Sequence, residues 1–270
     1  MECLKMIKVT HKGVTHTVPC GKCAFCFSNK RSSWMFRIHH EMRTQLHKGY
    51  FLTLTYDEKH VKRTAEGRLS LRFRDVQLWL KVLRKRKYYV KYIIVGEYGS
   101  ETKRPHYHAL IWTDCAPEML EKLWFRGRIH FGKLTMASAM YTLKYIIQPK
   151  QKDENGVERT RAQFSKGLGL AYLDTAAYNY HTFDYDSPEM FSIIDGKKVA
   201  LPRYYRQKIF TKYQLTKHAH KAKWDSIRKR RARMRELKMQ GISNTKVYMH
   251  ALRVDHAKRI IENTKYGQSL

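Results

Sequence analysis

The hydrophobic and polar positions follow helical spacing in some parts of the chain and strand spacing in others. Helical spacing of apolar residues predicts helices at 31–46, 74–86, 118–125 and 135–148. Runs rich in β-branched and aromatic residues, or alternating in polarity, predict strands at 50–56, 89–95 and 106–112. Ser32 and Ser33 suit the cap of the first helix, and Pro149 ends the fourth.

From the first predicted strand onward, the order strand, helix, strand, strand, helix predicts an α+β fold. We expect an antiparallel or mixed central sheet with helices on one face, similar to the split βαβ plan, and a turn between Gly96 and Pro105. The pattern weakens after Lys150 until a strongly basic helix at 214–240. The expected domains are a cysteine-rich segment at 1–30, a central domain at 31–212 and a basic, mainly helical extension at 213–270.

Composition adds a strong charge imbalance to this plan. The 270 residues include 54 Lys and Arg against 23 Asp and Glu, a net charge of +31. Such an excess repels itself unless an anion relieves it, so we expect a nucleic acid as partner, with a membrane surface as the alternative. No apolar run approaches the ~18 residues of a membrane span, and the start lacks a signal sequence. We therefore expect a soluble protein of the cytoplasm.

His106 and His108 lie two positions apart in the third predicted strand. Alternate strand residues project from the same face, so the two imidazoles could chelate a divalent cation. If the second and third strands pair across their turn, Glu97 is a third ligand within reach, which suits Mg²⁺ or Mn²⁺. Asp57, Glu101 and water are the alternatives for this third place. Two ordinary strand histidines remain the simpler interpretation of the triplet alone.

A second histidine triplet, His218 to His220, falls in a region predicted to be helical. There the two side chains would point about 200° apart, which makes a poor chelator. Tyr141 and Tyr145, four residues apart in the last predicted helix of the central domain, share one face with Lys144 beside them. A phenol with a pKa of about 10 needs a nearby cation to act as a nucleophile, and the alternative is a pair of core tyrosines.

Three further groups of residues are candidates for binding. Cys20, Cys23 and Cys26, in CxxCxxC spacing, could hold structural zinc with Cys3 or His16 as the fourth ligand; free buried thiols are the alternative. Basic residues are expected to contact DNA phosphates, although a charged run is often only a solvated face. They are Arg104, Arg203, Arg228, Arg230 and Arg231.

The motifs FLTLTY, GEYG with RPHYHALIW, and YTLKYIIQPK occur in an order that resembles the HUH endonucleases of rolling-circle replication. With VPCGKCAFC, FSKGLGLAYL and LPRYYRQKIF, the resemblance extends over most of residues 1–215 to the replication initiators of gokushovirus-type microviruses, small single-stranded DNA phages. It implies an RRM-like HUH palm within residues 31–212.

The resemblance also implies a mechanism. His106 and His108, with Glu97, would hold Mg²⁺ or Mn²⁺ against the scissile phosphate of a single-stranded origin. Tyr141 or Tyr145 would attack, leaving a 5′-phosphotyrosine and a free 3′-OH that later reseals the circle, with Lys144 offsetting charge. The chain lacks a GxxxxGK[ST] nucleotide motif, so unwinding in the bacterial host cell would fall to a host helicase. The alternatives are a non-catalytic single-stranded nucleic-acid-binding protein and a metal-dependent nuclease that uses water.

Overall fold

The computed structural model describes residues 3–44, 47–147 and 156–265, except for the side chains of 145–147, 264 and 265. The chain forms two compact units, 34–170 and 1–33 with 171–270, which we describe separately. The domain boundaries expected after residues 30 and 212 stay predictions. Within the described ranges, no helix combines the length and the apolar character that a membrane crossing requires.

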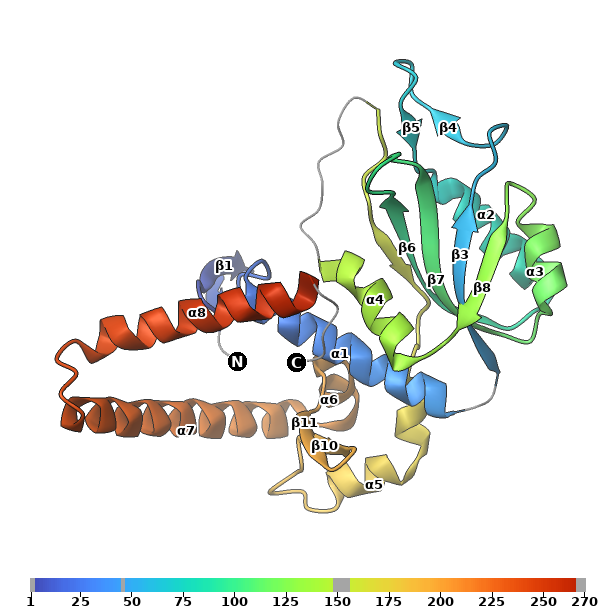
Figure 1. Cartoon of the computed structure of the whole chain (residues 1–270). Helices are drawn as coiled ribbons and strands as arrows, with labels where there is room; N and C mark the ends of the chain where they lie inside the picture. The colour runs from blue at the N-terminus through green and yellow to red at the C-terminus, as the bar shows by residue number, and fades with distance from the viewer. Residues whose placement is uncertain (1–2, 45–46, 148–155, 266–270) are drawn as a thin grey trace. The chain divides into compact units, whose positions relative to one another are not determined.

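The unit at 34–170 is built on a five-stranded sheet (Figure 1). Its strands, in spatial order, are β8 (Ile129–Lys133), β3 (Lys48–Thr55), β7 (Pro105–Thr113), β6 (Val90–Tyr98) and β9 (Ala162–Phe164). All neighbouring strands are antiparallel, and β4 (Lys62–Arg63) and β5 (Leu69–Ser70) form a separate small hairpin. The three predicted strands and the α+β class are therefore confirmed, whereas the two edge strands are additional.

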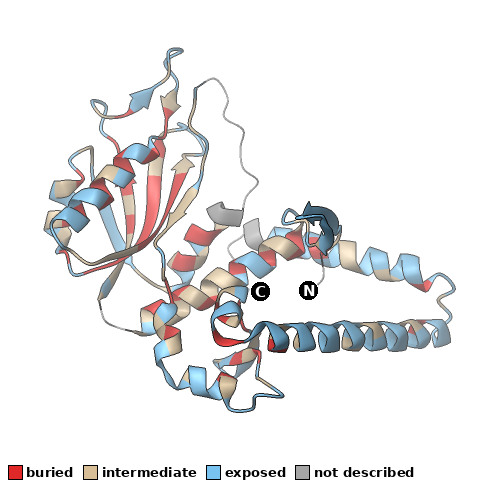
Figure 2. Ribbon diagram, turned by 180° about the vertical axis from the view of Figure 1, so that it is seen from behind, coloured by how far each residue is buried: buried red, intermediate tan, exposed pale blue. Residues whose placement is uncertain are grey.

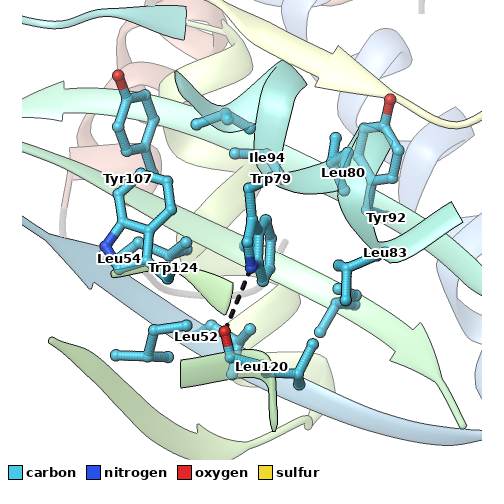
Figure 3. Close-up of a cluster of buried hydrophobic side chains, with 14 of the residues drawn as sticks. Leu52, Leu54, Trp79, Leu80, Leu83, Tyr92, Ile94, Tyr107, Leu120 and Trp124 are labelled. Atoms are coloured by element: carbon cyan, nitrogen blue, oxygen red, sulfur yellow. Dashed lines mark hydrogen bonds between the residues drawn. The ribbon is translucent and has the colours of Figure 1, made fainter. Parts of the chain in front are cut away.

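One face of this sheet packs against α2 (Phe73–Lys85) and α3 (Pro117–Leu123). Figure 3 shows the resulting core, in which large side chains of the helices meet the inward residues of β3, β6 and β7. The indole nitrogen of Trp79 donates a hydrogen bond of 3.2 Å to the backbone carbonyl of Leu120, which ties α2 to α3. The burial of this cluster makes the sheet a rigid platform for side chains on its opposite face.

The expectation of helices on one face only is wrong. The second face carries α4 (Met136–Ile147) and the part of α1 (Ala24–Arg43) that lies within this unit. The physical reason is the composition of the two central strands, because β6 and β7 are apolar on both faces: Ile93 and Leu110 pack against α1 and α4, whereas Ile94 and Ile111 face α2. A strand that is buried on both sides requires cover on both sides.

Two predicted boundaries also differ from the structure. The first helix begins at Ala24, so Ser32 and Ser33 lie inside it rather than at its cap. Its early turns bury Phe25 together with the polar Ser28, and this mixture conceals the helical pattern. Strand β6 continues to Tyr98, so the turn to β7 is shorter than the predicted segment from Gly96, and Glu97 belongs to the sheet.

The other unit contains two hairpins and most of the helical residues outside the sheet. One hairpin joins β1 (Ile7–His11) and β2 (Val14–Val18), and the other joins β10 (Phe191–Ile194) and β11 (Lys197–Ala200). The helices are η1 (Leu170–Asp174), α5 (Ala176–Thr182), α6 (Arg203–Ile209), α7 (Lys212–Met239) and α8 (Thr245–Lys265). The predicted basic helix is confirmed as α7, which starts at a capping box of Thr211 and Gln214 and is exposed along most of its length (Figure 2).

Candidate metal and nucleophile site

Strand register brings the predicted metal ligands together. In the β6–β7 ladder, Glu97 lies opposite His106 and Val95 lies opposite His108. Residues opposite each other in an antiparallel pair project from the same face, so Glu97, His106 and His108 share the α4 side of the sheet. They lie near the end of β6 and the start of β7, where the turn leaves the face open.

The three side chains converge to within coordination distance of a common point. Glu97 Oε2 is 3.4 Å from His106 Nε2 and 3.1 Å from His108 Nε2. One donor atom from each residue lies within 4.8 Å of the other two, and all three side chains are largely buried. One carboxylate and two imidazoles in this arrangement fit a divalent cation that keeps open positions for phosphate oxygens.

Both imidazoles are fixed by hydrogen bonds to their other ring nitrogen. His106 Nδ1 lies 3.1 Å from the carbonyl oxygen of Arg104, and His108 Nδ1 lies 3.1 Å from the hydroxyl of Thr53 on β3. Each contact turns the corresponding Nε2 toward Glu97, as an outer hydrogen bond does for a metal-binding histidine. Burial lowers the pKa of His106, but its hydrogen bonds to Glu97 and to the Arg104 carbonyl outweigh burial and raise the pKa above its ordinary value.

The alternative third ligands lie elsewhere. Asp57 is paired with His60, at 2.8 Å from its Nδ1, and Glu101 is an exposed residue of the turn between β6 and β7. Neither belongs to the group formed by Glu97, His106 and His108.

Tyr141 meets this cluster from α4. Its ring makes an edge contact with His108, with centroids 5.1 Å apart, and a second edge contact with Phe51 at 6.2 Å. The residue is 43% exposed, so a strand of DNA can reach its hydroxyl. Lys144 is half-buried on the same helix; the backbone of Tyr145 is also in α4, but its side chain lies outside the described residues.

Other residues on this face were not predicted from the sequence. Thr53 and Thr55 of β3 lie opposite His108 and His106, and His130 of β8 lies opposite Thr53. Arg128, next to the start of β8, is exposed like His130, and its carbonyl accepts hydrogen bonds from the backbone and side chain of Thr55. The signal that could have identified them is the position of a polar residue on a strand face that also bears the histidines.

Thr53 is expected to act by positioning His108. The substitution Thr53→Val keeps the shape of the side chain but removes the hydroxyl that holds Nδ1, so we expect Mn²⁺ affinity to fall about 10- to 100-fold. Titration calorimetry measures this loss. The matched control is Thr55→Val on the same face, whose hydroxyl binds the Arg128 carbonyl rather than a histidine. Equal affinities of the two variants would contradict the positioning role.

The four predicted cysteines form a second cluster in the other unit. Cys23 Sγ lies 3.8 Å from Cys3 Sγ and 3.5 Å from Cys26 Sγ, and Cys20 Sγ lies 4.0 Å from Cys26 Sγ. Four thiolates around Zn²⁺ at ~2.3 Å would stand about 3.8 Å apart, so these spacings fit a tetrahedral zinc site. Cys3 takes the fourth place in the group, whereas His16 lies in β2 opposite Val9 and is not a member.

Backbone N–H groups support thiolates in this cluster. The amide of Cys20 donates to Cys3 Sγ at 3.2 Å, and the amide of Lys22 donates to Cys20 Sγ at 3.4 Å. Burial acts to raise the pKa of the Cys23 thiol, but the backbone amides of Leu4 and Cys26 outweigh it and lower the pKa to about 6. The Arg253 guanidinium of α8 donates to the Cys3 carbonyl at 3.0 Å, which links the cluster to the last helix.

We expect one zinc ion per chain, lost in the variant Cys23→Ser. A serine hydroxyl is a poor zinc ligand, and losing a structural zinc removes several kcal/mol of folding free energy, so the melting temperature should fall as well. Elemental analysis and a thermal melt measure the two effects. Cys115→Ala is the control, because Cys115 is buried outside the cluster. Wild-type protein purified without zinc would contradict the prediction.

The predicted DNA-binding arginines are scattered. Arg104 donates through Nη2 to the Tyr56 carbonyl at 2.7 Å and also pairs with Glu58, so its guanidinium braces the segment after β3. Arg203 is exposed at the start of α6, and Arg230 and Arg231 are exposed on α7. The last predicted residue, Arg228, is paired with Asp225 of the same helix at 2.6 Å.

Comparisons with known proteins agree with this arrangement. Residues 49–150, which contain Glu97, both histidines and Tyr141, match the model of a family described as replication-associated protein ORF2. No solved structure matches the chain. The fold and site define a viral replication-associated protein. The chain belongs to the family of replication-associated protein ORF2.

Its relatives are proteins of microviruses. The chain is 27% identical over 231 residues to replication-associated protein VP4 of Bdellovibrio phage phiMH2K, covering 74% of this chain and 69% of the relative. It is 26% identical over 232 residues to replication-associated protein ORF2 of Spiroplasma virus 4, covering 74% and 70%. It is 23% identical over 228 residues to replication-associated protein ORF4 of Chlamydia phage 1, covering 72% and 54%.

Proposed function

We propose that this protein is a metal-dependent, site-specific nickase and ligase that initiates rolling-circle replication of a single-stranded DNA phage. The sheet at 34–170 would serve as an RRM-like HUH palm. The observation that carries the proposal is the edge contact between Tyr141 and His108, because it sets a nucleophile beside the three-ligand cluster. A cation held by Glu97, His106 and His108 would neutralise charge on the scissile phosphate.

The chain's own residues supply the rest of the first step. The Tyr141 oxygen attacks phosphorus in line as its phenolic proton leaves to solvent, and the P–O3′ bond breaks. The departing 3′ oxygen takes up a proton, so the products are a free 3′-OH and a 5′-phosphotyrosine. Lys144, one helical turn from Tyr141, offsets the negative charge that develops on the phenolic oxygen.

The phosphotyrosine keeps the energy of the broken bond. A returning 3′-OH can therefore displace the tyrosine and close a unit-length circle without ATP. Tyr145, four residues further along α4, would make the second attack in successive rounds. The partners of this reaction are the single-stranded origin and a host helicase, in the cytoplasm of a bacterial host.

Incubation with single-stranded origin DNA and Mg²⁺ or Mn²⁺ tests the proposal. The expected result is a covalent protein–DNA species that survives denaturation, together with a free 3′-OH. Cleavage that releases a free 5′-phosphate would identify a nuclease that uses water instead. Binding without cleavage under either metal would identify a non-catalytic single-stranded DNA-binding protein.

A further inference from the structure

The hairpin of β1 and β2 is an exposed two-stranded ribbon, which we call the N-terminal ribbon (Ile7–Val18). All five residues of β1 and four of the five in β2 are exposed, so neither face packs against the rest of the chain. An isolated two-stranded hairpin is only marginally stable in water. Its persistence therefore requires other support.

Both ends of the ribbon are held. Cys3 precedes β1 and Cys20 follows β2, and the amide of Cys20 donates to Cys3 Sγ at 3.2 Å, so the thiolate cluster closes the base. At the tip, Lys12 and Gly13 have φ angles of 49° and 75°, which is the two-residue turn with the twist that hairpins favour. Asn or Gly suits such a turn better than Lys, so Lys12 places an ammonium group at the tip at some cost in conformation.

The charge around the ribbon points to a polyanion. Between Cys3 and His40 the sequence contains no Asp or Glu, whereas it contains Lys5, Lys8, Lys12 and Lys22. One face of the ribbon is polar, because Lys8 pairs with Thr17 and Thr10 pairs with Thr15. Threonine hydroxyl and methyl groups can contact base edges, and lysines contact phosphates.

We infer that the N-terminal ribbon binds double-stranded DNA by lying in the major groove. That groove, about 12 Å wide, admits a two-stranded ribbon. Single strands are instead bound through stacking on aromatic rings, and the ribbon contains no Phe, Trp or Tyr. The inference rests on the proposed function, and it adds a second substrate class: the ribbon grips duplex beside the origin while the sheet acts on the single strand.

Duplex affinity of the full chain tests the inference. The probe is a fluorescent duplex of about 20 base pairs, roughly two helical turns, measured by anisotropy without added Mg²⁺ or Mn²⁺. The variant Lys8→Gln with Lys12→Asn removes two charges and keeps a residue suited to the turn. We expect its affinity to fall about tenfold and the salt dependence of binding to lose about two phosphate contacts.

The second hairpin of the same unit provides a matched control. It has the same kind of two-residue turn, at Asp195 and Gly196, with φ angles of 49° and 74°. Lys197→Gln with Lys198→Gln removes the same charge there, and we expect duplex affinity to stay within about twofold, as for nonspecific charge loss. Equal losses in the two double variants, or no loss in the ribbon variant, overturn the inference.

Two additional readouts separate the ribbon from other roles. The ribbon variant should form the covalent adduct with single-stranded DNA as the wild type does. If the wild type itself forms no adduct, the proposed nicking fails, whereas the duplex comparison still decides the role of the ribbon. A change in oligomeric state on sedimentation, with duplex affinity unchanged, would make the ribbon a protein contact and overturn the inference.

Discussion

Replacing Tyr141 by Phe is expected to abolish the first cleavage of single-stranded origin DNA, with a rate loss of at least about 10³-fold. The substitution removes only the hydroxyl, so the edge contacts of the ring with His108 and Phe51 should remain. A single-turnover assay with labelled DNA, resolved on a denaturing gel, measures the covalent species directly.

Two further variants make this experiment decisive. Tyr145→Phe should keep the first cleavage but fail to release a resealed circle, and the double variant should form no adduct at all. Tyr213→Phe, at an exposed position on α7, is the control for loss of a surface phenol. If Tyr141→Phe cleaves at the wild-type rate and Tyr145→Phe does not, Tyr145 is the first nucleophile and the proposed order is reversed.

The ligand cluster could be predicted from the sequence because it depends on local rules. Alternation along one strand places His106 and His108 on the same face, and antiparallel pairing across a short turn brings Glu97 opposite His106. Tyr141 is harder to place, since its contact with His108 depends on α4 packing against the sheet.

The elements that sequence patterns missed are those without a burial signal. Strand β8 is short and mostly exposed, and the N-terminal ribbon is exposed on both faces, so neither shows the contrast that marks a half-buried strand. The cover on both faces of the sheet could have been predicted. The runs 92–95 and 109–112 are apolar at every position, which is typical of strands buried on both sides.

The fourth cysteine illustrates a different limit. Cys3 lies 17 residues from Cys20, and the ribbon between them returns the chain to its starting point. A ligand that arrives through such a hairpin has no fixed spacing, so composition alone left Cys3 and His16 as alternatives. Register resolves the choice, because His16 is turned onto the face of Val9 within the ribbon.

Removing both metal-binding imidazoles should have an effect as large as removing the nucleophile. The variant His106→Ala with His108→Ala leaves Glu97 as the remaining ligand of the group, so we expect Mn²⁺ binding by calorimetry to be lost and cleavage to fall at least about 10³-fold. Binding of single-stranded DNA should persist, because the net charge of +31 lies mostly outside this cluster. That separation distinguishes a loss of chemistry from a loss of substrate.

The chain contains its own control for this experiment. His218 and His220 repeat the same two-residue spacing, but they lie on α7, where their side chains point about 200° apart and cannot share an ion. His218→Ala with His220→Ala should therefore keep both Mn²⁺ affinity and cleavage. If the two double variants lose metal equally, the ion is held by general histidine content rather than by the strand pair. If the variant of His106 and His108 still cleaves, the cluster does not serve the reaction, and the position of Tyr141 beside it carries no catalytic meaning.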